Sequence, residues 1–106
     1  MQGTLSYTTA SILLAISGGR QYGFDVMDCT GFPSGTVYPA LRRLEQAGLV
    51  ASEWERDAAP QRDQRPPRKY YSITSAGETA LARALARYPL LSRPAQIHAS
   101  QDTLRR

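Results

Sequence analysis

The sequence has one cysteine, one histidine and no long apolar run, and each shortage excludes a class of protein. Cys29 has no partner for an internal disulfide, and with His98 it cannot supply the three or four ligands of a zinc site. The longest aliphatic run, 12–16, is five residues long, whereas a membrane-spanning helix needs about 20. Met1-Gln2-Gly3 lacks the basic start of a secretory signal. We therefore expect a cytoplasmic, reduced protein with no metal, no cofactor and no membrane partner.

Lysine is scarce too, because all but one of the 13 basic residues are arginine and Lys69 is the exception. Nine acidic residues leave a formal net charge of +4. Arginine suits planar contacts with phosphate and guanine, so a polyanion is a reasonable partner. The 106 residues are enough for one domain and too few for two. Charge and length permit DNA binding without arguing for it.

Hydrophobic spacing predicts three helices in the first half of the chain. Apolar residues recur at helical intervals before Gly18-Gly19, which indicates a first helix over about 5–17. A second, short helix over 22–29 ends at Gly31, with Phe24, Val26 and Met27 as its apolar surface. The third helix is expected to run from an N-cap at Ser34 to Ala47, with Gly48 in the left-handed position that follows.

The third helix is the most informative stretch, because its residues divide into two faces at about 100° per residue. One face is apolar and should lie in the core: Val37, Ala40, Leu41, Leu44 and Gly48. The other points outward: Gly35, Pro39, Arg42, Gln46 and, at the margin, Arg43. Since Pro39 has no amide hydrogen, it is comfortable only in the first turn, which places the helix start between Ser34 and Thr36.

The second half of the chain predicts a β-hairpin and a further helix. Two strands are predicted, one by a two-residue period from Val50 to Arg56 and the other by the β-forming residues 69–73. A long polar loop over 57–68 is expected to join them. A capping box of Ser75 and Glu78 is expected to start a fourth helix, which Pro89 ends. Pro94 is expected to start a short one through Leu104.

Several single residues have simple expected roles. Trp54 and Tyr71 are expected in the core, and Cys29 is expected to be a small buried hydrophobe. His98 is expected to be solvated. No constellation of residues fits catalysis, so we expect the protein not to be an enzyme.

The order of these elements predicts a mainly helical chain with a small β-hairpin wing (α+β), the layout of a winged helix-turn-helix domain. We place this domain at residues 1–74, with the wing at about 57–69, and a C-terminal helix and tail at 75–106. Such a fold delivers its third helix to the DNA major groove and its wing to the flanking backbone. Small residues at the start of the third helix and cations at the wing base suit that role.

The chain resembles the PadR-like transcriptional regulators in four segments, Tyr22-Gly23-Phe24, Pro33 to Glu45, Ala47 to Val50, and Arg68 to Thr74 with Ala76-Gly77 after it. The resemblance implies a dimeric repressor that binds a palindromic operator and is released by a small-molecule effector. It also implies DNA-facing positions, namely Tyr22, Ser34, Thr36, Tyr38, Arg42 and the segment 68–70. In the family a long helix after the wing forms the dimer, whereas Pro89 and Pro94 interrupt that region here.

Taken together, the residues and the resemblance predict a sequence-specific regulator that binds double-stranded DNA as a homodimer. Arg42 and Arg43 would read bases or phosphates, and cations of the wing would hold the flanking backbone. The predicted DNA-binding set is Tyr22, Ser34, Gly35, Thr36, Tyr38, Pro39, Arg42, Arg43, Arg65, Arg68, Lys69 and Tyr70. The predicted dimerisation set is Leu81, Leu85 and Tyr88.

Alternatives stay open at this level. Arg42 and Arg43 alone would also suit a solvated helix, and Tyr38 would also suit packing at the core edge. The whole domain would also suit a module that binds an acidic protein, or a small-molecule sensor with weak DNA binding. The sequence does not locate an effector pocket.

Overall fold

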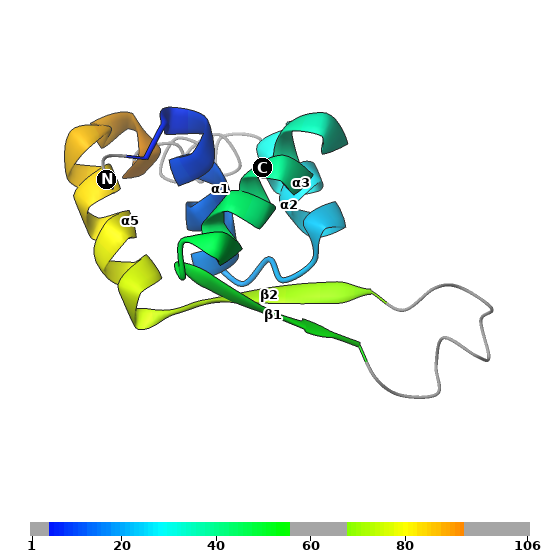
Figure 1. Ribbon diagram of the computed structural model, residues 1–106. Coiled ribbons are helices and arrows are strands. Elements are labelled where there is room, and N and C mark those ends of the chain that lie inside the picture. The colour runs from blue at the N-terminus through cyan, green and yellow to red at the C-terminus, as the bar shows by residue number, and fades with distance from the viewer. Residues whose placement is uncertain (1–4, 56–67, 93–106) are drawn as a thin grey trace, which may run out of the picture.

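The computed structural model describes residues 5–55 and 68–92, which form four α-helices and one antiparallel hairpin (Figure 1). The elements are α1 (Tyr7–Ser17), α2 (Gly23–Thr30), α3 (Ser34–Gln46), β1 (Val50–Trp54), β2 (Lys69–Ile73), α5 (Ser75–Arg87) and a 3-10 helix, η1 (Pro89–Ser92). This order confirms the predicted winged helix-turn-helix fold. The wing loop, Arg65, His98 and the helix expected after Pro94 lie outside the described residues.

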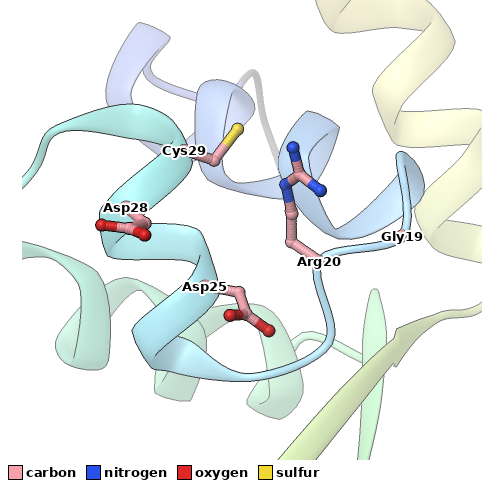
Figure 2. Close-up of a pocket in the computed structure, with 5 residues that line it drawn as sticks. All are labelled: Gly19, Arg20, Asp25, Asp28 and Cys29. Carbon is pink, nitrogen blue, oxygen red and sulfur yellow. The ribbon is translucent and has the colours of Figure 1, made fainter.

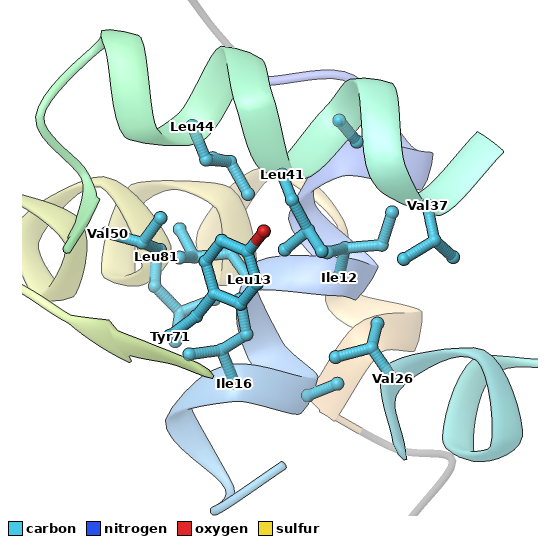
Figure 3. Packing of buried hydrophobic residues seen from close by; sticks show 12 residues of the cluster. Ile12, Leu13, Ile16, Val26, Val37, Leu41, Leu44, Val50, Tyr71 and Leu81 are labelled. Carbon is cyan, nitrogen blue, oxygen red and sulfur yellow. The ribbon is translucent and has the colours of Figure 1, made fainter. Parts of the chain in front are cut away.

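One apolar core joins the helices to the hairpin (Figure 3). The predicted inner face of α3 is confirmed for Val37, Ala40, Leu41 and Leu44, which are at most 1% exposed. Gly48 is exposed instead, because the helix ends at Gln46. Burial of a valine or leucine side chain contributes about 1.5–3 kcal/mol, so the buried stripe fixes which side of α3 points outward. The stripe meets residues from every neighbouring element, including Ile12, Leu13, Ile16, Val26, Val50, Tyr71 and Leu81.

The hairpin has one face toward the helices and one away from them. Val50 pairs with Ile73 and Trp54 with Lys69 across the two antiparallel strands. Because successive strand residues point to opposite faces, Lys69 shares the helix-side face with Tyr71, which is 6% exposed in the core. The two strands run from the side of α5 past α3 and α2 (Figure 1).

Two expectations of burial were wrong, those for Trp54 and Cys29. Trp54 is 61% exposed, because it lies on the helix-side face but at the far end of β1, past the last helix residue that could cover it. Phe24 is 63% exposed and Cys29 is exposed as well. The short helix α2 buries only Gly23 and Val26, which leaves both side chains outside the core.

The N-caps of α3 and α5 each lie one residue earlier than predicted. Pro33, not Ser34, is the N-cap of α3 and makes no side-chain capping bond, so Ser34 is the first helical residue. Thr74, not Ser75, caps α5, since its Oγ1 accepts a bond from the Gly77 amide at 3.0 Å. The same hydroxyl donates to the Gly48 carbonyl at 2.8 Å, which holds Thr74 at this junction.

Glycine and proline end the helices where the sequence predicts, but Pro39 does not lie in the first turn of its helix as expected. Gly31 and Gly48 have φ of 79° and 78°, the left-handed conformation expected after a helix. Helix α5 ends at Arg87 before Pro89, as predicted. Pro39, however, lies inside α3 and beyond its first turn, because the helix begins at Ser34. The Gly35 carbonyl therefore lacks the amide that another residue at position 39 would offer.

Helix α5 packs against α1 and the connection before β1. A Cβ at Gly77 would collide with the backbone carbonyl of Leu49, so only glycine allows this close approach. Ala84 meets Ala10 of α1 and Leu91 of η1 in a small second cluster. Among the helices that the structure describes, none is long and apolar enough to span a bilayer.

Candidate nucleic-acid interface

The outward face of α3 is open to a partner. Opposite the buried stripe, Arg42, Arg43 and Gln46 are exposed. Neither arginine forms an ion pair with another described residue. Arginine donates in bidentate fashion to guanine and glutamine pairs in the same way with adenine, both in the major groove. The helical periodicity placed Gln46 on the outward face, but Gln46 was not predicted to bind DNA. Its outward position was the feature of the sequence that could have added it to the predicted site.

The N-terminal turn of α3 offers little obstruction. Ser34 and Gly35 are exposed and Thr36 is half-buried. A Cβ at Gly35 would meet nothing within 4 Å, so the folded chain itself does not require a glycine there. Small side chains and a helix N-terminus together suit close approach of a phosphate.

Tyr38 is both packed and accessible. Its side chain is 41% exposed, yet its ring lies so close to Gly23 that a Cβ there would collide with it. Because Gly23 has no side chain, the Tyr38 ring of α3 can pack against the start of α2. Both roles considered from the sequence, packing at the core edge and contact with a partner, are compatible with this position.

Glu45 connects α3 to both strands of the hairpin. Ser52 Oγ of β1 donates to Glu45 Oε2 at 2.5 Å, and Lys69 Nζ of β2 lies 3.5 Å from Glu45 Oε1. The Ser52 hydroxyl, together with the charge of Lys69, lowers the pKa of the Glu45 carboxyl despite some desolvation. Sequence reasoning did not single out Glu45, because these partners are distant along the chain.

Trp54 and Tyr71 border the same junction. Lys69 Nζ lies 5.5 Å from the ring centroid of Trp54 and 5.9 Å from that of Tyr71, within range of cation–π attraction. Burial, and then the negative charge of Glu45, raises the pKa of the Tyr71 hydroxyl. The exposed Trp54 ring therefore belongs to the surface beside α3, not to the core.

Two other predicted residues at the wing base, Arg68 and Tyr70, lie on the other face of the hairpin from Lys69. The Arg68 guanidinium carbon is 4.4 Å from the ring centroid of Tyr22, and Arg68 Nη2 is 3.7 Å from Glu55 Oε2. Tyr70 Oη donates to Glu53 Oε1 at 2.8 Å. Alternation thus separates Arg68 and Tyr70 from Lys69, although the sequence places all three in one basic segment.

Tyr22 also ties the start of α2 to the edge of β2. It forms an isolated antiparallel bridge with Tyr70, and their rings meet edge-on at 6.1 Å between centroids. The Tyr71 amide donates to the Gln21 carbonyl at 2.7 Å beside this bridge. Within this chain Tyr22 thus supports the hairpin, and its predicted contact with DNA stays a prediction.

The predicted dimerisation residues have contacts within this chain. Leu81 is 7% exposed in the main core, and Leu85 is half-buried beside it. Tyr88 Oη donates to the Leu5 carbonyl at 2.9 Å, and its ring meets Tyr7 edge-on at 5.5 Å. Their role in a dimer stays a prediction. The domain boundary at residue 74 also stays a prediction, and Leu81 of α5 packs in the same core as the residues before that boundary.

A separate pocket lies between α2 and the turn that precedes it (Figure 2). Its volume is about 400 Å³, and it is lined by Gly19, Arg20, Asp25, Asp28 and Cys29. None of these residues belongs to the predicted DNA-binding set. The described residues contain no group of three or more His, Cys, Asp or Glu side chains placed to hold a metal ion.

Comparison with known proteins identifies the family. The model of the transcriptional regulator PadR-like family matches residues 12–83. A PadR family transcriptional regulator from Eggerthella lenta DSM 2243 is similar in structure, with a TM-score of 0.59 at 29% identity, over 83% of this chain and 80% of that chain. A PadR-like transcription factor from Bacteroides fragilis gives a TM-score of 0.65 at 29% identity, over 83% and 85% of the two chains.

A third solved structure supports the fold alone. It is a PadR family transcription regulator from Clostridium difficile R20291, with a TM-score of 0.67 at 20% identity over 89% of this chain and 99% of that chain. No curated protein matches. The family consists of transcriptional regulators, which confirms the expectation that the chain is not an enzyme. Since the match covers more than half of the sequence, including all of α3 and the hairpin strands, the chain belongs to the PadR-like family of DNA-binding transcriptional regulators.

Proposed function

We propose that this chain is a sequence-specific repressor that inserts α3 into the major groove and lays the wing along the flanking backbone. The observation that carries the proposal is the outward face of α3, where Arg42, Arg43 and Gln46 are exposed opposite a fully buried stripe. Free guanidinium and amide groups on an exposed helix face are the donors that read base edges. A regulator of this kind acts on the chromosome and therefore in the bacterial cytoplasm.

The proposed binding unit is a two-fold homodimer on a palindromic operator. A two-fold axis would place two copies of α3 about 34 Å apart, in successive major grooves of one DNA face. The dimer contact is proposed at α5 and the chain that follows it, through Leu85 and Tyr88, with Leu81 supporting the helix from the core. Leu90, which is 60% exposed on η1, adds apolar surface next to them.

The family resemblance also supports release from DNA by a small-molecule effector. Binding of an effector to a conformation that holds the two copies of α3 at another spacing would lower operator affinity. Titration of candidate effectors into the protein–DNA complex is the direct assay of this part of the proposal.

The decisive experiment is selection of bound duplexes from a random-sequence pool by the full chain. We expect enrichment of one motif with two-fold symmetry, and an affinity that falls by about 0.9 log units per log unit of salt for each phosphate neutralised. An affinity that is the same for all duplexes, or that does not change between low and physiological salt, would contradict the proposal. Capture of an acidic protein together with that result would favour a protein-interaction module.

A further inference from the structure

We infer that Glu45 is a positioning residue that fixes the wing hairpin against α3, so that the two DNA-binding elements keep one relative orientation. The inference rests on the proposed function and deepens it, because it assigns sequence preference partly to a residue that does not itself suit contact with DNA. A carboxylate is repelled by phosphate, so any benefit from Glu45 must come through the groups that it holds.

The contacts of Glu45 reach both strands from one carboxylate. Its Oε2 accepts the bond from Ser52 Oγ on β1, and its Oε1 faces Lys69 Nζ on β2. Ser52 and Lys69 lie on the helix-side face of the hairpin, which they share with Tyr71, the residue that pairs with Ser52. One side chain of α3 therefore links the helix to both strands.

The contacts of Glu45 lie at the point along the hairpin where the apolar core ends. At the start of β1, Val50 is buried in the core and needs no polar connection to α3. Further along, Glu53 and Trp54 are exposed, so the apolar core no longer holds the strand. Glu45 acts where the hairpin leaves the core, so a small rotation there would shift the far ends of β1 and β2 relative to α3.

Glu45 also prepares Lys69 for a phosphate. The Lys69 side chain is 34% exposed, and its ammonium lies near both Glu45 and the Trp54 ring. An ammonium has three donors, so one can face the carboxylate while the others point to solvent. Loss of Glu45 would leave a flexible four-carbon side chain to be ordered only when DNA binds, at a cost in side-chain entropy.

Charge and position predict opposite results for Glu45→Gln, which makes the inference testable. If Glu45 were only a nearby negative charge, its neutralisation would raise the affinity for every duplex. If it positions the hairpin, the variant loses preference for the right sequence, because α3 and the wing no longer engage together. Ser52→Ala removes one of the two contacts without any change in charge.

The experiment uses the full chain with two duplexes of equal length, one selected from a random-sequence pool by the unaltered protein and one scrambled from it. We expect Glu45→Gln and Ser52→Ala each to lower the ratio of the two affinities by about tenfold, the effect of one misplaced base contact. Glu53→Gln is the matched control, since Glu53 bonds Tyr70 within the hairpin and lies on its other face. Its ratio should change by less than about twofold.

Hydroxyl-radical protection of the selected duplex separates positioning from general damage. In Glu45→Gln, protection at the flanking, wing-contacted backbone should weaken while protection around the centre of each half-site persists. Thermal unfolding checks that the variant folds, and Ser52→Ala, the smaller change, repeats the test if Glu45→Gln melts early.

Three results would overturn the inference, and they are distinguishable from one another. If the unaltered protein selects a motif but Glu45→Gln and Ser52→Ala keep the same affinity ratio, the positioning role is wrong and the proposed function stands. Equal tightening on both duplexes would also rule out the positioning role, and would identify Glu45 as a simple repulsive charge. If the unaltered protein selects no motif, the proposed function fails and the inference fails with it.

Discussion

The outward face of α3 and the base of the wing both present cations, but they hold them in different ways. Arg42 and Arg43 on α3 form no ion pair with any described residue. At the wing base, Arg68 lies beside Glu55 and over the Tyr22 ring, and Lys69 lies beside Glu45. The helix face is thus free to adapt to base edges, whereas the wing cations are held in place before DNA arrives.

Because of this difference, we expect the two surfaces to contribute differently to DNA binding. A flexible, unpaired guanidinium can choose between bases, which gives discrimination. A cation that is already paired must exchange its carboxylate for a phosphate, so its net gain on binding is smaller. Exposed ion pairs contribute only about 0.2–1 kcal/mol, so this exchange is feasible. Sequence preference should therefore come mainly from α3, and the wing should contribute register and general affinity.

The largest effect is expected for Arg42→Ala. Loss of a base contact should lower discrimination between the selected and the scrambled duplex by about 1–3 kcal/mol, with little change for the scrambled one. Arg83→Ala is the matched control, because it removes the same charge from an exposed position on α5. Competition binding at fixed salt measures both variants. An equal loss on both duplexes would make Arg42 a phosphate contact and would weaken the contrast between the two surfaces.

A smaller and uniform effect is expected for Trp54→Ala. The ring is 61% exposed and attracts Lys69, an interaction of about 0.5–1 kcal/mol at such a site. Removing it should weaken binding to both duplexes by several-fold, since Lys69 becomes less ordered, while thermal unfolding changes little. Phe24→Ala removes an equally exposed ring from α2 and serves as the control. A selective loss on the selected duplex would instead show that the wing base reads sequence.

The outward face of α3 was predictable from the sequence, whereas the arrangement of the wing base was predictable only in part. The 3.6-residue period of α3 was sufficient to predict its buried stripe, because a helix face depends only on local geometry. Alternation along β1 placed Trp54 on the correct face, but where the helices stop covering that face depends on the tertiary structure. The same alternation also separates Arg68 from Lys69, although their adjacency in the sequence suggested one basic cluster.

Glu45 illustrates what the sequence could not show. Its partners Ser52 and Lys69 become neighbours only through the strand pairing, which sets Ser52 opposite Tyr71. Nothing local to α3 indicates that its one acidic residue contacts the hairpin strands rather than water. The identity of the recognition helix was predictable from local pattern, whereas the connection between helix and wing required the folded chain.

A modest gain in affinity is expected for Glu55→Gln. This change weakens the hold on Arg68, whose Nη2 lies 3.7 Å from Glu55 Oε2. Because a phosphate would no longer compete with a full negative charge, affinity for both duplexes should rise by about two- to fivefold, in line with an exposed ion pair. Glu78→Gln on α5 is the charge-matched control. A fall in affinity would mean that the carboxylate orients Arg68 for DNA, as Glu45 is inferred to orient Lys69.

The smallest expected effect is the pH dependence of the Ser52–Glu45 bond. The pKa of the Glu45 carboxyl is lowered in the folded chain, first by the Ser52 hydroxyl, from an ordinary value of 4.5. A carboxyl whose pKa falls on folding stabilises the fold above its ordinary pKa and loses that contribution as the pH drops through the folded value. The gap in unfolding free energy between the unaltered protein and Ser52→Ala should therefore be constant near neutrality and narrow in acid.

The size of this gap should be below about 1 kcal/mol, because the Glu45 side chain is 37% exposed and solvent screens its charge. Urea unfolding of both proteins across neutral and acidic pH measures it, and titration of all other groups cancels in the difference. In a Glu45→Gln background the same Ser52→Ala change should have no pH dependence, since no carboxyl titrates there. A gap that stays constant into acid in the unaltered background would show that the hydroxyl does not favour the ionised carboxylate, and the wing base would then be held mainly by Lys69.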